Sequence, residues 1–174
     1  MASLRPAKCY RKIERPYTRQ SRKKPRKGYV KGVPGKKINK FQMGDPNKHY
    51  SLKAYLVSEN AVQIRHNALE AARIAANKYM EKSAGKEAFF MKVLVYPHHV
   101  LRENALATGA GADRFQTGMR KAFGKPIGVA AQVRPNQNLI EIRADASKEK
   151  DMKEALKRAS SKFPTKCRIV FENQ

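Results

Sequence analysis

A glycine-rich segment in the second half of the chain carries the residues that come nearest to a nucleotide-binding motif. Four glycines lie close together beside two lysines: Gly109, Gly111, Gly118, Gly124, Lys121 and Lys125. A phosphate loop needs four residues between its first Gly and a Gly-Lys-Ser/Thr ending, because the loop amides and the Lys must surround the phosphates. Here five residues separate Gly118 from Gly124, and Pro126 follows Lys125. A dinucleotide motif would need a third Gly at position 114, so the segment matches neither fingerprint.

The other residue types that catalyse reactions are not grouped in this sequence. His98 and His99 are adjacent, so their side chains diverge, and no Cys or acidic cluster follows nearby to complete a metal site. Cys9 and Cys167 are the only cysteines and lack a paired-ligand spacing. The 14 acidic residues are scattered, mostly beside cations, which is typical of surface ion pairs. We therefore expect no enzyme, no metal and no cofactor.

The glycine-rich segment instead has the composition of a binding surface. Small residues let a backbone approach a ligand closely, and neighbouring cations can contact phosphate. The cations here are Arg114, Arg120, Lys121 and Lys125. A plain Gly-rich connection with solvated cations would explain the glycines, but less well so many cations beside them.

The overall charge indicates an anionic partner. The chain has 38 Lys and Arg against 14 Asp and Glu, a net charge of +24, and such a surplus repels itself unless it is neutralised. No apolar run approaches the roughly 18 residues of a membrane span, and no apolar stretch follows the first basic residues. We expect an intracellular protein with no membrane partner and no small-molecule substrate, and nucleic acid is the favoured partner.

Residues 1–40 are predicted to form a basic RNA-binding extension. They carry 15 basic residues and one acid, Glu14, and Pro and Gly interrupt every stretch that could become a helix. Tyrosines between the charges can stack on bases while cations meet phosphates. The residues expected to bind RNA here are Arg5, Lys8, Tyr10, Arg11, Lys12, Arg15, Tyr17, Arg19, Arg22, Lys23, Lys24, Arg26, Lys27 and Tyr29. The alternative is a solvated charge run with incidental aromatics.

Residues 41–174 have the composition of a globular domain that would position these binding segments. Apolar patterning predicts strands at 51–58, 61–65, 88–96 (buried and central), 127–133, 139–144 and 167–171. Residues 127–133 and 139–144 flank a Pro- and Asn-containing turn and are read as a hairpin. Residues 97–114 lack an apolar period and are predicted to be a long loop.

Two amphipathic helices are predicted in the same domain. The first covers 67–82 and ends before Gly85, with apolar residues at helical spacing and with Arg73 and Lys78 on other faces, where they can meet RNA phosphate. The second is capped by Ser147 and buries Met152, Ala155, Leu156, Ala159 and Phe163. The expected class is α+β, a two-layer α/β sandwich whose mostly antiparallel or mixed sheet carries both helices on one face.

Several motifs together resemble one family of ribosomal proteins. They lie at 5–11, 69–79, 110–114 and 162–164, and the most specific reads Gln116-Thr117-Gly118-Met119-Arg120-x-Ala122-Phe123-Gly124-Lys125-Pro126. The chain resembles large-subunit ribosomal protein L-ten-e, the archaeal and eukaryotic counterpart of bacterial L-sixteen. The resemblance implies an α/β-hammerhead type of fold, packed among large-subunit rRNA helices near the peptidyl-transferase centre and the tRNA-binding cleft. It also implies that the 102–114 loop, with Arg102, Gly109, Gly111 and Arg114, points toward tRNA.

The sequence thus predicts a structural constituent of the large ribosomal subunit in the cytoplasm. Its expected partners are large-subunit rRNA, tRNA and neighbouring large-subunit proteins, and catalysis would belong to RNA. A free RNA chaperone or DNA-compacting protein would explain the charge but not the long motifs. An RNA-modifying enzyme would need a cofactor loop, a metal cluster or an acid/base pair, and none is recognisable.

Overall fold

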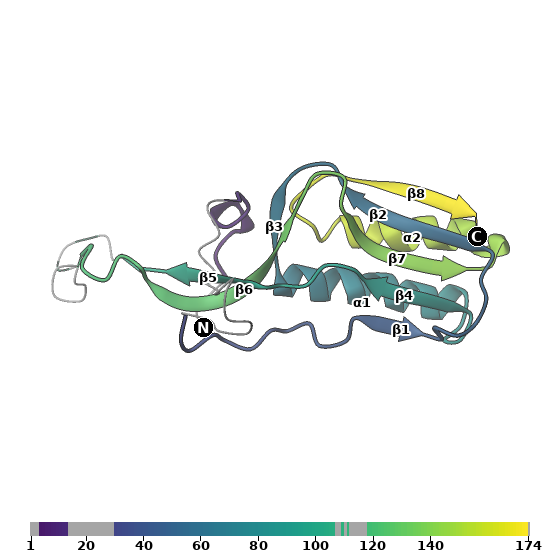
Figure 1. The fold of residues 1–174 in the computed structure, drawn as a ribbon, viewed down its shortest axis with the longest axis horizontal. Coiled ribbons are helices and arrows are strands. Elements are labelled where there is room, and N and C mark those ends of the chain that lie inside the picture. Colours follow the sequence, from purple (N-terminus) through teal and green to yellow (C-terminus); the bar gives the residue numbers. More distant parts are fainter. Residues whose placement is uncertain (1–3, 14–29, 107–108, 110, 112–117, 174) are drawn as a thin grey trace, which may run out of the picture.

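The computed structural model describes residues 4–13, 30–106, 109, 111 and 118–173. Within them the chain forms two α-helices and eight strands, and every strand pairing is antiparallel (Figure 1). This confirms the predicted α+β class.

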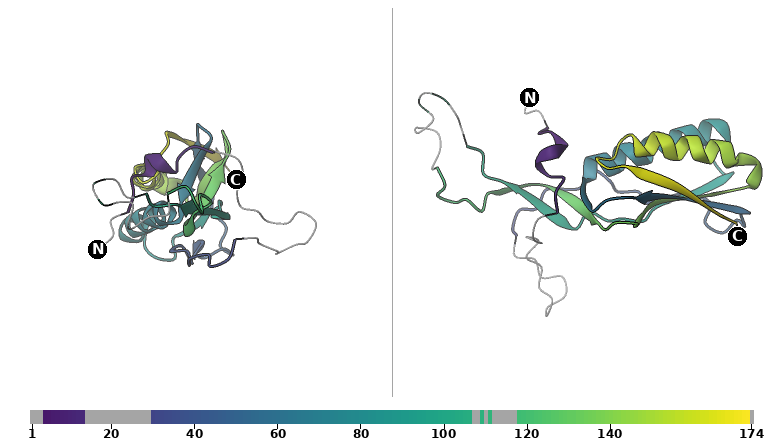
Figure 2. Two further views of the ribbon diagram at one scale, coloured as in Figure 1. Left: turned by 90° about the vertical axis from the view of Figure 1, so that its left-hand side faces the viewer. Right: turned by 90° about the horizontal axis from the view of Figure 1, so that it is seen from above.

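The body of the molecule is a five-stranded sheet with both helices on one face. In spatial order the strands are β1 (Gln42–Gly44), β4 (Phe89–Val93), β7 (Asn138–Ala144), β2 (Leu52–Ser58) and β8 (Cys167–Asn173). The helices α1 (His66–Ser83) and α2 (Glu149–Ser160) lie side by side above this sheet (Figure 2, right).

A smaller three-stranded sheet extends from one end of the body. Its order is β3 (Val62–Arg65), β6 (Lys125–Val133), β5 (His99–Glu103). The pair β5–β6 projects away from the helices as a two-stranded ribbon (Figure 1). The register pairs His99 with Ala130 near the body and Glu103 with Lys125 at the far end, with an irregularity after Leu101. The ribbon therefore carries residues 104–106 and 118–124 away from the core.

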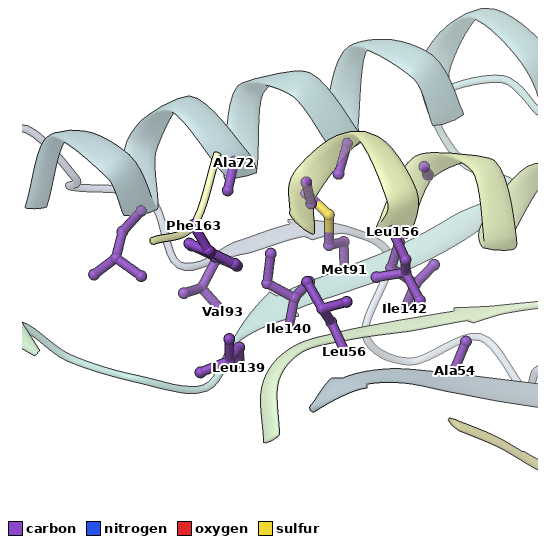
Figure 3. Packing of buried hydrophobic residues seen from close by; sticks show 14 of the residues in the cluster. Ala54, Leu56, Ala72, Met91, Val93, Leu139, Ile140, Ile142, Leu156 and Phe163 are labelled. Atoms are coloured by element: carbon purple, nitrogen blue, oxygen red, sulfur yellow. The ribbon is translucent and has the colours of Figure 1, made fainter. Parts of the chain in front are cut away.

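The core lies between the five-stranded sheet and the helices. Alternate residues of the inner strands point toward the helices, as the period of two requires: Figure 3 shows Ile142 beside Leu156 of α2, and Leu56 beside Ile140. The helical period of 3.6 residues gives α1 and α2 one buried face each: Leu69, Ala72, Ala76 and Met80; Met152, Ala155, Leu156 and Ala159. Both predicted helices are thereby confirmed, and Gly85, with φ of +93°, follows α1 as expected.

The prediction that residues 97–114 form a loop was wrong for residues 99–103. Residues 99–103 form β5 of the small sheet, and its Val100 and Leu101 are buried. The strand is too short to show a period in the sequence, and its pairing with β6 joins residues far apart in the chain.

The predicted hairpin was also wrong, because β6 and β7 belong to different sheets. The turn between them does form, with Asn136 at φ of +59°. However, the Asn136 amide donates to the Ser58 carbonyl at 2.8 Å, and the Ser58 amide donates to the Gln137 carbonyl at 3.0 Å. The turn is therefore fastened to the end of β2, and the chain crosses there from one sheet to the other.

Three smaller expectations also change. The middle strand is β7, and β4 lies between β7 and the unpredicted short strand β1. Ser147 does not cap α2: it lies in a 3₁₀ turn, Ala146–Lys148, and no side chain caps the helix that follows. Ile38 is fully buried in the core, so the body recruits a residue from the segment expected to be only an extension.

Candidate nucleic-acid interface

The first described residues, 4–13, lie along the small sheet. The side-chain amide of Gln63 in β3 donates to the carbonyls of Tyr10 at 3.1 Å and Lys12 at 2.7 Å, and the Gln63 backbone amide donates to the carbonyl of Arg11 at 2.9 Å. One residue of β3 therefore fixes three consecutive residues of the basic segment.

A second anchor joins the same segment to β5. The hydroxyl of Tyr10 donates to Glu103 at 3.0 Å, and Arg5 forms an ion pair with the same carboxylate. Burial, followed by the hydrogen bond to Glu103, raises the pKa of Tyr10. Because β3 and β5 are the two edges of the small sheet, residues 5–12 are tied to both edges.

These anchors divide the RNA-binding residues expected near the N-terminus. Tyr10 is half-buried and Arg5 is paired with Glu103, so both have intramolecular roles. Lys8, Arg11 and Lys12 are exposed and can meet an anionic partner. The remaining expected residues lie outside the described part of the chain: Arg15, Tyr17, Arg19, Arg22, Lys23, Lys24, Arg26, Lys27 and Tyr29.

The far end of the ribbon is closed by a turn that Arg102 helps to hold. Arg102 lies in β5, half-buried, and donates to the carbonyl of Phe123 at 2.9 Å. Its guanidinium carbon is 3.5 Å from the centroid of the Phe123 ring, a cation–π contact. Asn104 adds a longer hydrogen bond, 3.3 Å, to the carbonyl of Gly118. The residue expected at the start of a loop is therefore a strand residue that fastens the turn.

Because residue 124 is a glycine, the turn can closely approach the backbone at the end of β5. Its φ is +76°, and a Cβ placed there would lie 2.6 to 2.9 Å from backbone atoms of Glu103 and Asn104. These distances are too short for any side chain, and backbone atoms cannot rotate aside as a flexible side chain could. Only glycine fits this position without moving the turn.

The surface of the ribbon end combines cations with apolar side chains. Arg120, Lys121 and Lys125 are exposed, as expected for residues that contact phosphate. Leu106, Met119 and Phe123 are 47%, 69% and 49% exposed, so apolar surface lies among these cations. Apolar groups beside cations suit a nucleic acid, whose bases and sugars offer flat faces between phosphates.

Gly109 and Gly111 are exposed beyond the ribbon end. Both have positive φ, +133° and +78°, and no atom lies within 4 Å of where a Cβ would stand. A ligand could therefore approach their backbone closely. Arg114 and the rest of 112–117 lie outside the described residues.

The two helix cations expected to meet RNA differ in their surroundings. Arg73 donates to Glu70 at 2.9 Å, pairs with it a second time at 2.5 Å, and its side chain is only 14% exposed. The hydrogen bond to Glu70 raises the pKa of Arg73. Lys78 is exposed beside a groove between α1 and α2. Lys78 is therefore available to a partner, whereas Arg73 is already held.

Sequence reasoning missed the residues that position this interface. Gln63, Glu103 and Phe123 each contact a residue of another segment, up to 93 positions away in the sequence. No local sequence pattern predicts such a contact. The Glu70–Arg73 pair was open to prediction, because residues three apart on a helix are neighbours.

Two kinds of site are absent from the residues that the structure describes. No group of three His, Cys, Asp or Glu side chains within 4–13, 30–106, 109, 111 and 118–173 is placed to hold a metal ion. Over the same ranges, neither helix is both long and apolar enough to cross a membrane.

Comparison with known proteins finds relatives along nearly the whole chain. A family model described as ribosomal protein L16p/L10e matches residues 16–170. The large ribosomal subunit protein uL16 of Staphylothermus marinus is 52% identical over 170 residues, 97% of this chain and 94% of the relative. Proteins of the same name from Methanococcus maripaludis and Archaeoglobus fulgidus are 47% and 45% identical over 168 residues, 97% of this chain and 94% and 92% of those relatives. The chain therefore belongs to the ribosomal protein L16p/L10e family, whose members are structural proteins of the ribosome and not enzymes.

Proposed function

We propose that this protein is a structural constituent of the large ribosomal subunit that binds large-subunit rRNA near the peptidyl-transferase centre and extends its β5–β6 ribbon toward tRNA. The observation that carries the proposal is the ribbon itself. It projects from a body that has a buried core of its own, and it ends in cations beside exposed apolar groups. Such an element gains little stability from its own fold and can gain much more by binding a nucleic acid.

The rRNA contacts are assigned to cations of the basic segment and of the body. Among the described residues these are the exposed side chains Lys8, Arg11, Lys12, Lys78, Arg120, Lys121 and Lys125. Arg5, Tyr10 and Arg73 support that surface from within, through Glu103 and Glu70. The +24 charge supplies the long-range attraction to RNA.

The tRNA contact is assigned to residues 102–114 together with the turn at 118–124. Arg102 would hold the turn in place, while Gly109 and Gly111 would let the backbone approach a sugar-phosphate chain closely. In this assignment the ribbon sets the distance from the body at which the contact is made.

Gly111→Val tests the tRNA assignment, with Gly85→Val as a matched control. Both glycines have positive φ and open space around the missing Cβ, so both variants should incur similar local strain, on the order of 1–2 kcal/mol. Large subunits carrying Gly111→Val are expected to assemble but to bind tRNA several-fold more weakly and to make peptide more slowly. Subunits carrying Gly85→Val should behave as wild type.

The readouts are incorporation into purified large subunits, tRNA binding and peptide synthesis. If the two variants bind tRNA and make peptide equally well, residues 102–114 only connect neighbouring elements and do not contact tRNA. A failure of Gly111→Val to incorporate would make their role structural, and the tRNA assignment would be wrong.

A further inference from the structure

A basic groove runs between the two helices, on the side of them that faces away from the sheet. It has a volume of about 540 Å³ and is lined by Ala75, Lys78, Tyr79, Lys82, Arg158, Ser161 and Lys162. Four of these seven lining residues are cations, and none is acidic. Apart from Lys78, the proposed function leaves this surface unused.

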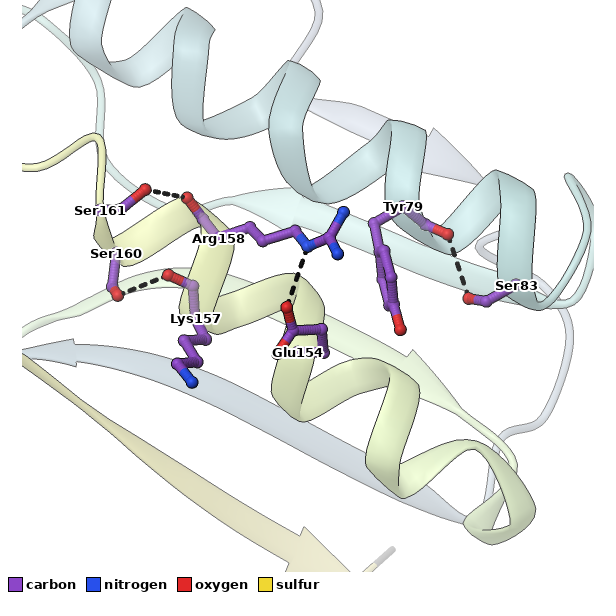
Figure 4. Close-up of polar contacts among 7 residues, drawn as sticks. All are labelled: Tyr79, Ser83, Glu154, Lys157, Arg158, Ser160 and Ser161. Atoms are coloured by element: carbon purple, nitrogen blue, oxygen red, sulfur yellow. Dashed lines mark hydrogen bonds and ion pairs between the residues drawn. The ribbon is translucent and has the colours of Figure 1, made fainter.

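The floor of the groove is a stacked pair of side chains from the two helices. The guanidinium carbon of Arg158 lies 4.2 Å from the centroid of the Tyr79 ring (Figure 4). Glu154, one turn earlier on α2, accepts a hydrogen bond from Nε of Arg158 at 3.0 Å. The stack and the ion pair with Glu154 together fix the guanidinium beside the Tyr79 ring, so the two side chains form one flat surface in the groove. The neighbouring Lys157 points away from α1 (Figure 4).

Cations line the groove from both helices. Lys78 and Lys82 are four residues apart on α1, which places their Cβ atoms about 5–6 Å apart. This distance is comparable with the spacing of successive phosphates along an RNA strand. Across the groove, Arg158 lies in the last turn of α2, and Lys162 follows in the turn after that helix ends at Ser160. Cations on both sides of one groove therefore fit a polyanion better than a single anion.

We propose that this groove binds the sugar-phosphate backbone of rRNA, with Lys78, Lys82 and Lys162 on phosphates and the Arg158–Tyr79 pair against a ribose or base. The proposal rests on the proposed rRNA binding and assigns one subsite of it. Ammonium groups pair with phosphate, and a guanidinium plane and an aromatic ring both offer flat surfaces to a nucleoside. An acidic protein segment would match the charge but would have no nucleoside for the aromatic floor to contact.

The first arm of the test compares two double variants of equal charge. Lys78→Glu with Lys162→Glu reverses one cation on each side of the groove, and Lys86→Glu with Lys166→Glu makes the same change at exposed sites that do not line it. Binding to full-length large-subunit rRNA is measured over a range of salt concentrations. The groove variant should bind more than tenfold more weakly than the control, and its slope of log affinity against log salt should be shallower by about 1.4–1.8 for two lost contacts.

The second arm places a cleaving probe in the groove and leaves all of the groove's cations unchanged. This arm therefore does not depend on how well the charge variants fold. An iron chelate is attached to Ser161→Cys in a chain with Cys9→Ser. Burial raises the pKa of Cys167 to about 11, so its thiol stays protonated and unreactive. In assembled large subunits the probe should cut one short stretch of rRNA, whereas a probe on Glu87→Cys should not cut that stretch.

The outcomes separate the groove from the wider proposal. If wild-type protein does not bind the rRNA at all, the proposed function fails. If wild type binds but the two double variants bind alike, or the probe at position 161 cuts no rRNA, the groove proposal is overturned and the groove faces solvent or an acidic protein.

Discussion

Replacing Gly124 with valine is expected to displace the turn at the end of the β5–β6 ribbon and to impair translation by subunits that carry the variant. A Cβ at this position would lie 2.6 Å from the backbone carbon of Glu103, 2.8 Å from its oxygen and 2.9 Å from the amide nitrogen of Asn104. The strand or the turn must therefore shift, and the contacts of Arg102 with Phe123 would shift with it. The positive φ adds local strain on the order of 1–3 kcal/mol.

The matched control is Gly118→Val, in the same turn. Gly118 also has a positive φ, +59°, but no atom lies within 4 Å of where its Cβ would stand. Valine at this position therefore strains the backbone but does not clash with β5. Both variants should keep the helical circular-dichroism signal and the core, because Gly118 and Gly124 lie in the turn at the ribbon end, outside the core. Amide chemical shifts along residues 99–106 and 125–129 should move strongly in Gly124→Val only, and peptide synthesis should fall further than in the control. Shifts and synthesis equal to those of Gly118→Val would show that the close approach is not required.

Binding of the isolated protein to large-subunit rRNA is expected to weaken steeply with salt. Each neutralised phosphate adds about 0.7–0.9 to the slope of log affinity against log salt, so ten contacts give a slope of roughly −7 to −9. Replacing five cations by Gln should reduce the steepness by up to about 3.5–4.5. The five are Arg22, Lys23, Lys24, Arg26 and Lys27, chosen because the anchors of the N-terminal segment lie elsewhere, at Tyr10 and Gln63.

The thermal transition of that five-residue variant should stay close to wild type, because a charged segment interrupted by Pro and Gly is not expected to form part of a core. A wild-type slope near −1 would contradict the electrostatic account and indicate a mainly apolar partner. An unchanged slope in the variant would show that this part of the chain makes no RNA contact.

The elements that the sequence predicted well are those whose signal is local. The inner faces of α1 and α2 repeat every three or four residues, so Leu69, Ala72, Met152 and Leu156 could be assigned to the core. Strand β5 and the partners of β6 and β7 could not be predicted, because strand pairing joins residues distant in sequence. The Asn136 turn illustrates this: its residue types predicted a turn, but its hydrogen bonds to Ser58 decide that it joins two sheets.

The candidate interface was predictable as a charge pattern but not as a set of contacts. Exposed cations such as Lys8 and Lys121 follow from composition, whereas Tyr10 and Arg102 proved to have partners in other segments. The stack of Arg158 on Tyr79 likewise arises only when α2 lies beside α1. The α/β-hammerhead type, the division at residue 40 and the roles of 14–29 and 112–117 stay predictions.

The most direct test of the central claim is sedimentation of the tagged protein with large ribosomal subunits after a high-salt wash. Salt weakens the phosphate contacts of every RNA-binding protein, but a structural constituent is also packed among folded rRNA and neighbouring proteins. We therefore expect it to remain with the large subunit at about one copy each, while proteins held by charge alone are removed. Release of the protein into the free fraction, with subunits that remain intact and active without it, would contradict the proposed function.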